Sequence, residues 1–305
     1  MNPVVALIIT NVIWGAAAPI FKYALGNIPP FTLAFIRFFF AGILFLPFVL
    51  FHKYTISIKQ FLGICLGAFF SITINISFFF LALPKTDSIN APVIASSQPV
   101  FLFLFALFFL KEKLHKNILF GILISLIGVL IIIFSPLLRN HGTTIVQKDS
   151  ALVGNLFLMV ATFGAIMQTI IFKKILKEVK TTIVLSISFL FGSLTFLPLM
   201  ILELQNWSFS QLNEAGWTGI IFGVVFSSAI AYGLFIYGIS KLEAQEIGIF
   251  AYIDPVIAVI LAIPLLREYP TQWFFIGAIF VFIGILIAER RLHWHPFHKI
   301  FKIKN

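Results

Sequence analysis

The sequence predicts an all-α integral membrane protein with ten transmembrane helices, arranged as two inverted five-helix repeats. Three observations predict this fold class: the composition, a series of apolar runs and an internal repeat. Sixty per cent of the 305 residues are hydrophobic and only 10% are charged, whereas roughly a quarter of the residues in a soluble domain are charged. So few charges cannot cover a water-facing surface, and we therefore expect the chain to lie in a lipid bilayer.

Ten apolar runs lie between charges and turn residues, and an α-helix needs about 20 apolar residues to cross a bilayer. The small residues Ala16–Ala18 resemble the cleavage site of a signal peptide, but no Lys or Arg precedes the first run and further runs follow it. We therefore expect a membrane helix there. The predicted spans cover residues 3–22, 30–51, 59–82, 91–110, 117–134, 151–172, 182–203, 216–240, 246–266 and 271–289.

The longest polar connection, residues 135–150, divides the chain into two halves of five spans each. Its proline, glycine and charged residues are typical of a connecting loop. The sequence therefore predicts a first five-helix repeat at residues 1–134, a second at residues 151–289 and a basic tail at residues 290–305.

The two halves repeat one another along most of their length. From Gly63 to Gly128 the matching residues lie 156 positions apart without a gap, and earlier in each half the shift is 151, so that Lys22 matches Lys173. Hydrophobic repeats of this kind build transporters whose central site can face either side of a membrane. The pairs at the 156-residue shift include Gly63 and Gly219, Gly67 and Gly223, Ser71 and Ser227, Lys85 and Lys241, Pro99 and Pro255, Glu112 and Glu268, Gly121 and Gly277, and Gly128 and Gly284.

The odd number of spans in each half fixes their relation. The second half must sit upside down relative to the first, about a pseudo-twofold axis in the membrane plane. With the N-terminus in the cytoplasm, 15 of the 21 Lys and Arg residues lie in cytoplasmic loops and the tail, and five lie in outside loops. Because cytoplasmic loops carry the excess of Lys and Arg, we expect a multi-pass protein of the cell membrane with both termini cytoplasmic. The tail either lies against the anionic inner surface or is disordered.

Motifs of several other protein classes are absent from the sequence. It contains no Gly-Lys-Ser/Thr element, no His-Glu-x-x-His and no Gly-x-Ser-x-Gly, and all six histidines lie outside the predicted spans. We therefore expect no enzyme, no cofactor and no metal. The net charge of +10 is a signal of topology rather than of nucleic-acid binding, since the basic residues lie in short loops and the tail.

Charged residues inside a span are costly, roughly 2.5–3.5 kcal/mol at the centre on insertion scales. Asp254 lies near mid-bilayer in the ninth span and precedes Pro255, a pattern typical of an N-cap, so we expect this span to break and restart there. Asp254 either binds a cation, an amine or a proton, or only caps a kinked helix. Its repeat equivalent is Gln98, and inversion would place both residues on opposite sides of one central cavity.

Arg37 is the only arginine inside a span. It could hold a substrate carboxylate, pair with Asp87 or Glu268, or extend towards the lipid headgroups. Glu112 and Glu268 each have a basic neighbour in a loop, and we expect loop ion pairs for both.

Several uncharged polar and aromatic residues are weaker candidates. Trp14 lies near the middle of the first span, away from the interfaces where Trp usually anchors, so it stacks on a substrate, closes a gate or packs within the bundle. Of the set Ser71, Thr73 and Asn75, only part can face a cavity, and Asn75 is the candidate. Gln168, Tyr232 and Tyr252 are candidates of the same kind.

The sequence resembles the EamA-like permeases of the drug/metabolite transporter superfamily over nearly all of residues 3–289. The resemblance rests on Trp14-Gly15, on Arg37 and on a pattern present in both halves. It implies a proton- or gradient-driven or facilitative carrier of small metabolites, often an amino-acid exporter, with a substrate path between the halves. The two copies of the pattern are Ser97-Gln98-Pro99, Leu110 to Leu114, Gly121 and Gly128, and then Asp254-Pro255, Leu266-Arg267-Glu268, Gly277 and Gly284.

We therefore expect a secondary transporter that exports small metabolites such as amino acids by alternating access, with proton coupling through Asp254 as one mode. Its cavity would lie among the first, third, fourth, sixth, eighth and ninth spans. The rival readings are a passive channel or lipid scramblase of the same fold, and a membrane enzyme or assembly subunit. Expected partners are a small-molecule substrate and the bilayer, with the chain a monomer or homodimer. The expected substrate-binding residues are Trp14, Asn75, Gln98, Gln168, Tyr232, Tyr252 and Asp254, with Asp254 and Arg37 as the coupling charges.

Overall fold

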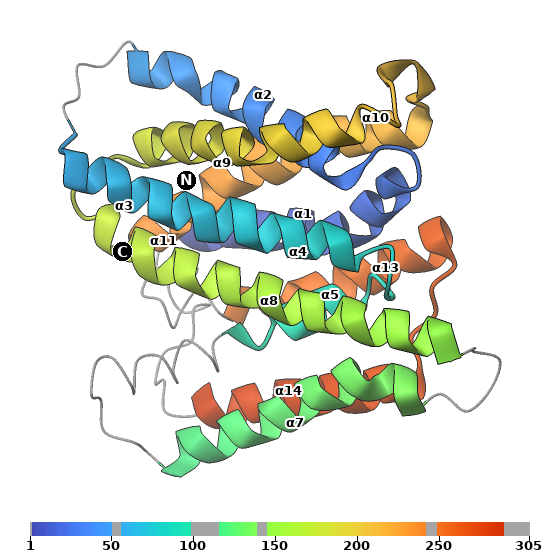
Figure 1. Ribbon diagram of the computed structural model, residues 1–305. Coiled ribbons are helices and arrows are strands. Elements are labelled where there is room, and N and C mark those ends of the chain that lie inside the picture. The colour runs from blue at the N-terminus through green and yellow to red at the C-terminus, as the bar shows by residue number, and fades with distance from the viewer. Residues whose placement is uncertain (1, 51–55, 99–115, 139–144, 242–248, 290–305) are drawn as a thin grey trace.

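The computed structural model describes residues 2–50, 56–98, 116–138, 145–241 and 249–289, and this part of the chain is built from helices without strands (Figure 1). The first half contains α1 (Pro3–Leu25), α2 (Pro30–Leu50), α3 (Ile58–Ala68), the π-helix η1 (Phe69–Ile74), α4 (Asn75–Ala82), α5 (Asn90–Ala95) and α7 (Lys116–Leu138). The second half contains α8 (Ile145–Ile175), α9 (Thr181–Glu203), η2 (Phe209–Gln211), α10 (Glu214–Ile221), the π-helix η3 (Phe222–Ile230), α11 (Ala231–Lys241), η4 (Ile249–Tyr252), α13 (Ile253–Leu266) and α14 (Gln272–Glu289).

Seven stretches of the described chain are long and apolar enough to cross a membrane, and two shorter apolar helices, Ile253–Leu266 and Gln272–Ile287, follow them. Of the predicted fourth span, only residues up to Gln98 belong to the described part. The predicted basic tail, residues 290–305, also lies outside it.

The helices extend into the connection predicted at residues 135–150. α7 continues to Leu138 and α8 already begins at Ile145. The polar residues Gln147, Lys148 and Asp149 thus form the first turns of a long helix. The polar residues of this connection mark where the apolar span ends. They do not mark where the helix ends, since a helix can continue beyond the hydrocarbon layer.

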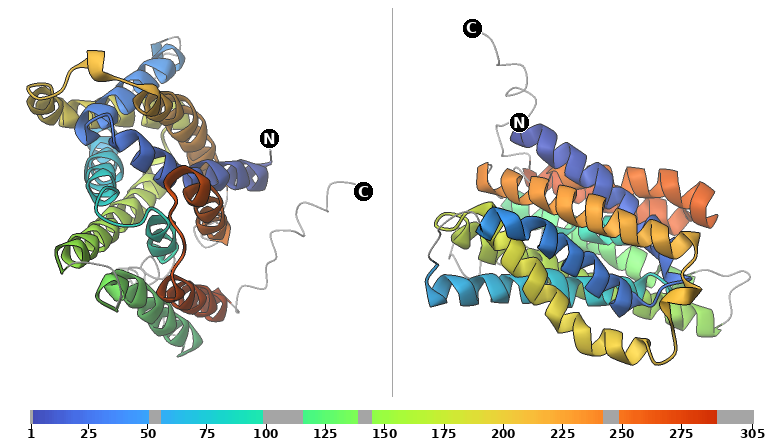
Figure 2. Two further views of the ribbon diagram at one scale, coloured as in Figure 1. Left: turned by 90° about the vertical axis from the view of Figure 1, so that its right-hand side faces the viewer. Right: turned by 90° about the horizontal axis from the view of Figure 1, so that it is seen from above.

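Two antiparallel helix pairs lie at opposite ends of the bundle, α2 with α9 and α7 with α14 (Figures 1 and 2). A Cβ atom added to Gly128 would lie 2.5 Å from the carbonyl oxygen of Gly277, and one on Gly284 would meet the carbonyl oxygen of Gly121. Both contacts need glycine because the two backbones touch directly. The two contacts are reciprocal, which means that the repeat turns one into the other: Gly284 is the equivalent of Gly128, and Gly121 is the equivalent of Gly277.

The contacts between α2 and α9 are reciprocal in the same way. The ring centroids of Phe38 and Phe196 lie 6.4 Å apart, and those of Phe45 and Phe189 lie 5.9 Å apart. At the 151-residue shift, Phe189 is the equivalent of Phe38 and Phe196 that of Phe45. Phe38 also contacts Phe189 directly, at 5.6 Å, so at this point a residue faces its own equivalent.

The two Gly-x-x-x-Gly motifs, Gly63 to Gly67 and Gly219 to Gly223, form close helix contacts. In the first half, Gly63 and Gly67 of α3 pack against Ile175 and Phe172 of α8. In the second half, Gly219 of α10 and Gly223 of η3 pack against Ala24 and Phe21 of α1. Ala24 and Phe21 are the equivalents of Ile175 and Phe172 at the 151-residue shift, so each half makes the same pair of contacts.

A π-helical segment interrupts the third span and the eighth span at matching places. η1 ends at Ile74 and η3 ends at Ile230, 156 residues later. π-helices are rare and are frequent at functional sites, because the wider turn changes which side chains and carbonyl groups face inward. The two segments therefore mark the level of the bundle at which a site is expected.

The ninth span restarts where the sequence predicts, but Asp254 does not cap it. α13 begins at Ile253 after the 3₁₀ turn η4, its N-cap residue is Tyr252, and Asp254 lies in its first turn. The N-cap prediction was therefore wrong by two positions, because the preceding turn is already helical. A carboxylate in the first turn still benefits from the positive end of the helix dipole. On the other side of the repeat, α5 ends at Ala95, and a turn follows before Gln98.

Candidate functional site

A cavity of about 190 Å³ lies between the two halves, and residues of both halves line it. Its walls come from the first, third, fourth, sixth, eighth and ninth spans, as the sequence predicts, together with one residue of the second span, Arg37. Seven of the eight candidate residues line it, namely Trp14, Arg37, Asn75, Gln98, Gln168, Tyr232 and Asp254.

Tyr252 is the exception, since it does not line this cavity. Its ring lies against that of Phe282 on α14, with centroids 5.4 Å apart. Residues 252 and 254 are two positions apart in a helical segment, so their side chains point in very different directions. Because Asp254 faces the cavity, Tyr252 faces a neighbouring helix.

Asp254 presents an unpaired carboxylate oxygen inside the protein. Its Oδ1 is buried and has no hydrogen-bond partner among the described residues. Gly15 of α1 allows this arrangement, because a Cβ atom at that position would lie 2.8 Å from the carbonyl oxygen of Asp254 and 2.9 Å from Cβ of Ile257. α1 and the start of α13 are therefore in backbone contact. A buried oxygen without a partner is costly, which is a reason to expect a ligand there.

Two amide side chains of the cavity differ in how they are used. Gln168 of α8 is only 5% exposed, and its Nε2 has no partner within the described part of the chain. Asn75, in contrast, donates from Nδ2 to the carbonyl oxygen of Ala161 at 2.7 Å, which joins α4 to α8. Gln168 thus has a donor available for a ligand, whereas the Asn75 donor is engaged in helix packing.

Arg37 is held by the π-helix of the eighth span and not by an acidic residue. Its Nε donates to Ser228 Oγ at 2.7 Å, and its Nη2 donates to Ser227 Oγ at 2.9 Å and to the Ser227 carbonyl at 3.5 Å. Its guanidinium carbon also lies over the rings of Phe21 and Phe38, at 4.9 and 4.7 Å from their centroids. None of these contacts is with a carboxylate.

The structure therefore corrects two of the three expectations for Arg37. The side chain is 2% exposed, so it does not extend to the headgroups. It does not pair with Glu268 either, because that carboxylate binds Lys22, and none of its contacts is with Asp87. The remaining expectation, a contact with a substrate, is compatible with its place in the cavity wall.

An aromatic cluster forms another wall of the cavity. The indole Nε1 of Trp14 donates to the carbonyl oxygen of Ser227 at 3.2 Å. Its ring lies 5.2 Å from that of Tyr232, edge to face, and 4.7 Å from that of Phe235. Trp14 thus packs within the bundle and also lines the cavity, which joins two of the readings left open by the sequence.

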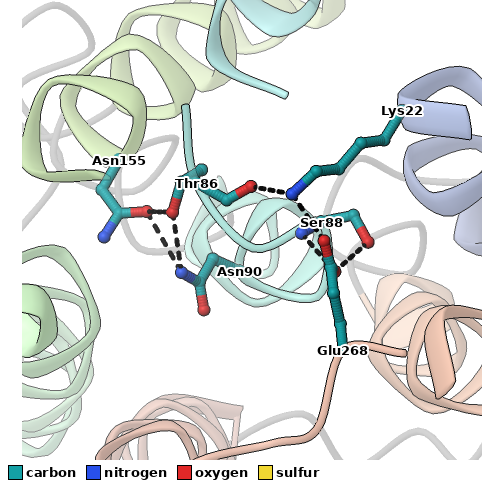
Figure 3. A network of polar contacts seen from close by, with 6 residues as sticks. All are labelled: Lys22, Thr86, Ser88, Asn90, Asn155 and Glu268. Carbon is teal, nitrogen blue, oxygen red and sulfur yellow. Dashed lines mark hydrogen bonds and ion pairs between the residues drawn. The ribbon is translucent and has the colours of Figure 1, made fainter. Parts of the chain in front are cut away.

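A polar network joins α1, the segment after α4, α8 and the chain after α13 (Figure 3). Glu268, which follows α13, was expected to pair within its loop, but it forms an ion pair with Lys22 of α1 at 2.5 Å. Its other oxygen accepts from the backbone N–H and the hydroxyl of Ser88. Lys22 and Glu268 both lie at repeated positions of the sequence, which marks each of them as a residue of interest. Their pairing with one another could not be read from the sequence.

The described apolar helices and a cavity lined by both halves are features of a multi-pass membrane protein. The chain belongs to the EamA-like transporter family, whose model matches residues 1–134 and 152–289. It is 27% identical to the uncharacterized transporter YetK of Bacillus subtilis (strain 168), over 94% of this chain and 87% of that protein. It is 24% identical to a probable amino-acid metabolite efflux pump of Escherichia coli (strain K12), over 97% of both chains.

A solved crystal structure shares the fold. It matches with a TM-score of 0.64 and 18% sequence identity, over 96% of this chain and 99% of the other. Membership of the EamA-like family assigns the protein to transporters and not to enzymes.

Proposed function

We propose that this transporter is a secondary carrier that exports small metabolites, amino acids or related compounds, by alternating access through the cavity between its halves. One observation carries the proposal. Among the described residues, Arg37 in the cavity wall has no carboxylate partner, and the buried Oδ1 of Asp254, also in the wall, has no hydrogen-bond donor. A ligand with an acidic and an amino group would satisfy both.

The size of the cavity favours a small substrate. At about 190 Å³, it is smaller than the 300–1,000 Å³ that is usual for sites of drug-sized ligands. The printed name of the E. coli relative, an amino-acid metabolite efflux pump, agrees with this class. Trp14 and Phe235 offer an apolar surface for a substrate side chain, between the polar groups of the wall.

The reciprocal helix contacts support ten spans in two inverted repeats of five helices. Antiparallel pairs that exchange equivalent residues, as Gly128–Gly277 and Gly121–Gly284 do, are what a twofold axis in the membrane plane produces. A second pair of contacts fits the same axis, since Thr10 donates to the Ala231 carbonyl and Asn75 to the Ala161 carbonyl. Thr10 and Ala161, and Asn75 and Ala231, are repeat equivalents.

The distribution of basic residues supports the orientation. Both termini would lie in the cytoplasm of a cell whose plasma or inner membrane holds the chain, as a monomer or homodimer. In this orientation the end of the cavity marked by Lys22 and Glu268 faces outward. An exporter would then load substrate at the opposite end.

Substitution of Asp254 tests the proposal directly. In proteoliposomes, the wild-type protein should show saturable uptake that preloaded unlabelled substrate accelerates, in a screen of amino acids, amines, sugars and nucleosides. We expect Asp254→Asn to insert and purify as a monodisperse species. If Asp254 carries a coupling proton, the variant should keep exchange but lose accumulation driven by a pH gradient. If it binds the substrate amine, both should fall by about tenfold or more, since a hydrogen bond to a charged group contributes about 1.5–3 kcal/mol.

The rival function gives a different result in the same assay. A passive channel or a lipid scramblase would show flux that rises linearly with concentration and is not accelerated from the opposite side. Wild-type transport and pH dependence in Asp254→Asn would remove this residue from the mechanism.

The matched control is Asp149→Asn, because Asp149 is an exposed carboxylate on α8, and this variant should behave like the wild type. Asn155→Ala is not a suitable control, because the Asn155 side chain is buried and hydrogen-bonded to other residues.

A further inference from the structure

The ion pair between Lys22 and Glu268 lies directly beyond one end of the cavity. Ala18 of α1 lines the cavity, and Lys22 follows it by four residues, so both lie on the same helix face, about 6 Å apart along the axis. On α5, Ala91 lines the cavity, and the adjacent Asn90 belongs to the network in Figure 3. The ion pair therefore stands where a path from the cavity to this face of the membrane would run.

The pair joins the two halves of the chain. Lys22 Nζ contacts Glu268 Oε1 at 2.5 Å and donates to the Thr86 carbonyl at 2.6 Å. Glu268 Oε2 accepts from the Ser88 N–H at 2.7 Å and from its hydroxyl at 2.6 Å. The side chains of Lys22 and Glu268 are only 23% and 9% exposed. Charge-assisted hydrogen bonds that are partly shielded from water are stronger than exposed ones, so this cluster holds α1, the segment after α4 and the end of α13 together.

The same segment is anchored to the helices behind it. Thr86 Oγ1 donates to Asn155 Oδ1 of α8 at 2.7 Å, and Asn90 Nδ2 bonds to both. Asn155 Nδ2 in turn donates to the carbonyl oxygens of Ile132 and Ile133 in α7. Thr86 and Asn90 are thus fixed, and among the six residues of Figure 3 the charged ones are Lys22 and Glu268, which connect α1 to the end of α13.

The chain takes an unusual conformation to place Glu268. Arg267 adopts a left-handed backbone conformation with φ of 56°, the one non-glycine residue in the described part of the chain with a positive φ. The Arg267 N–H then bonds to the carbonyl of Ile263 and the Glu268 N–H to that of Ala262, which closes the end of α13. Glycine usually occupies such a position. This turn directs Glu268 back over the bundle towards Lys22.

We infer that Lys22 and Glu268 form a latch that keeps this end of the cavity closed, and that the carrier opens towards this face only when the two separate. The inference rests on the proposed alternating access. In that cycle, Thr86 stays anchored to Asn155 of α8 while Glu268 moves away from Lys22 with the end of α13. The latch sets the balance between the two states and does not bind substrate.

Cysteine accessibility tests the latch without any substrate. Ala91→Cys is introduced in a Cys65→Ala background, and a membrane-impermeant maleimide is applied from the face that carries Lys22. We expect slow labelling in this parent and about tenfold or faster labelling when Lys22→Gln or Glu268→Gln is added; tenfold corresponds to 1.4 kcal/mol. Lys85→Gln is the matched control. It removes a lysine from the same face that makes no bond to Glu268, and it should change labelling less than twofold.

A charge exchange separates a latch from general damage. Lys22→Glu alone places two carboxylates together and should label fastest, whereas the double variant Lys22→Glu with Glu268→Lys should return labelling towards the parent rate. Unchanged labelling in both Gln variants, or no rescue in the double variant, would overturn the inference. Labelling reports on the closed state even if no substrate is transported, so failure of the latch and failure of the proposed function are distinguishable.

Discussion

The two halves of the molecule agree in their helix contacts and differ in their cavity side chains. Gly63 and Gly67 of the first half make the same contacts as Gly219 and Gly223 of the second. The cavity charges have no such counterparts: at the equivalent positions, Ser188 stands for Arg37 and Gln98 for Asp254. The comparison teaches that the backbone packing follows the repeat, whereas the polar side chains of the cavity do not. Both fit the proposed carrier: similar packing would allow two similar states, and unlike side chains would bind one substrate in one orientation.

The largest effect should come from breaking the shared packing. Gly128→Ala and Gly284→Ala are equivalent changes, and each places a Cβ atom against the backbone of the partner helix. We expect both to lower the melting temperature and the yield of monodisperse protein to a similar degree, at a cost of about 1–3 kcal/mol or more, as for overpacked cores.

Gly233→Ala in α11 is the control for these two variants. Its added Cβ would meet only Phe45 Cζ, at 3.7 Å, so the change should be neutral, or stabilising through helix propensity by about 1 kcal/mol. Unequal melting temperatures for the two equivalent variants would count against symmetric packing.

The next largest effect should be a loss of transport that occurs when Arg37 of the first half is changed but not when its equivalent in the second half, Ser188, is changed. Arg37→Met keeps a long side chain but removes the bonds to Ser227 and Ser228. Because it also removes the cost of burying a charge, we expect a folded protein with transport reduced about tenfold or more. Ser188→Ala at the equivalent position removes a buried hydroxyl without a partner among the described residues, and should leave transport intact. Initial rates of uptake at equal protein density in the vesicles measure both. Equal losses in the two variants would show that the site is symmetric after all.

The smallest effect concerns one hydrogen bond in the cavity wall. Trp14→Phe keeps an aromatic ring and removes the bond to the Ser227 carbonyl, which is worth about 0.5–1.5 kcal/mol, so we expect substrate affinity to fall about two- to tenfold in a competition assay. Trp207→Phe loses a similar indole bond, to the carbonyl of Asn27 at 2.9 Å, far from the cavity lining. An equal fall in affinity in Trp207→Phe would place the cause in stability and not in the site.

The sequence predicted the helical membrane fold and most of the cavity wall because both depend on periodic or repeated features. Gly63 and Gly219 could be matched by spacing alone, and the packing follows from the missing side chain. That Tyr252 and Asp254 face different directions could have been read from their spacing in a helical segment, whereas the 3₁₀ turn η4 that ends at Tyr252 could not. The partner of Glu268 was also beyond reach, because ion pairs between halves depend on how a turn at Arg267 directs the chain.

The direct contact of Phe38 with Phe189 has a consequence for how substitutions act. Each of these rings faces its own equivalent, so the contact is the same whichever half is taken first. In a carrier whose states are exchanged by that symmetry, a change at such a self-facing position alters the energy of both states alike. Such a substitution can slow transport or destabilise the fold, but it does not favour the state open to one side of the membrane over the other. Directionality has to come from residues whose equivalents differ.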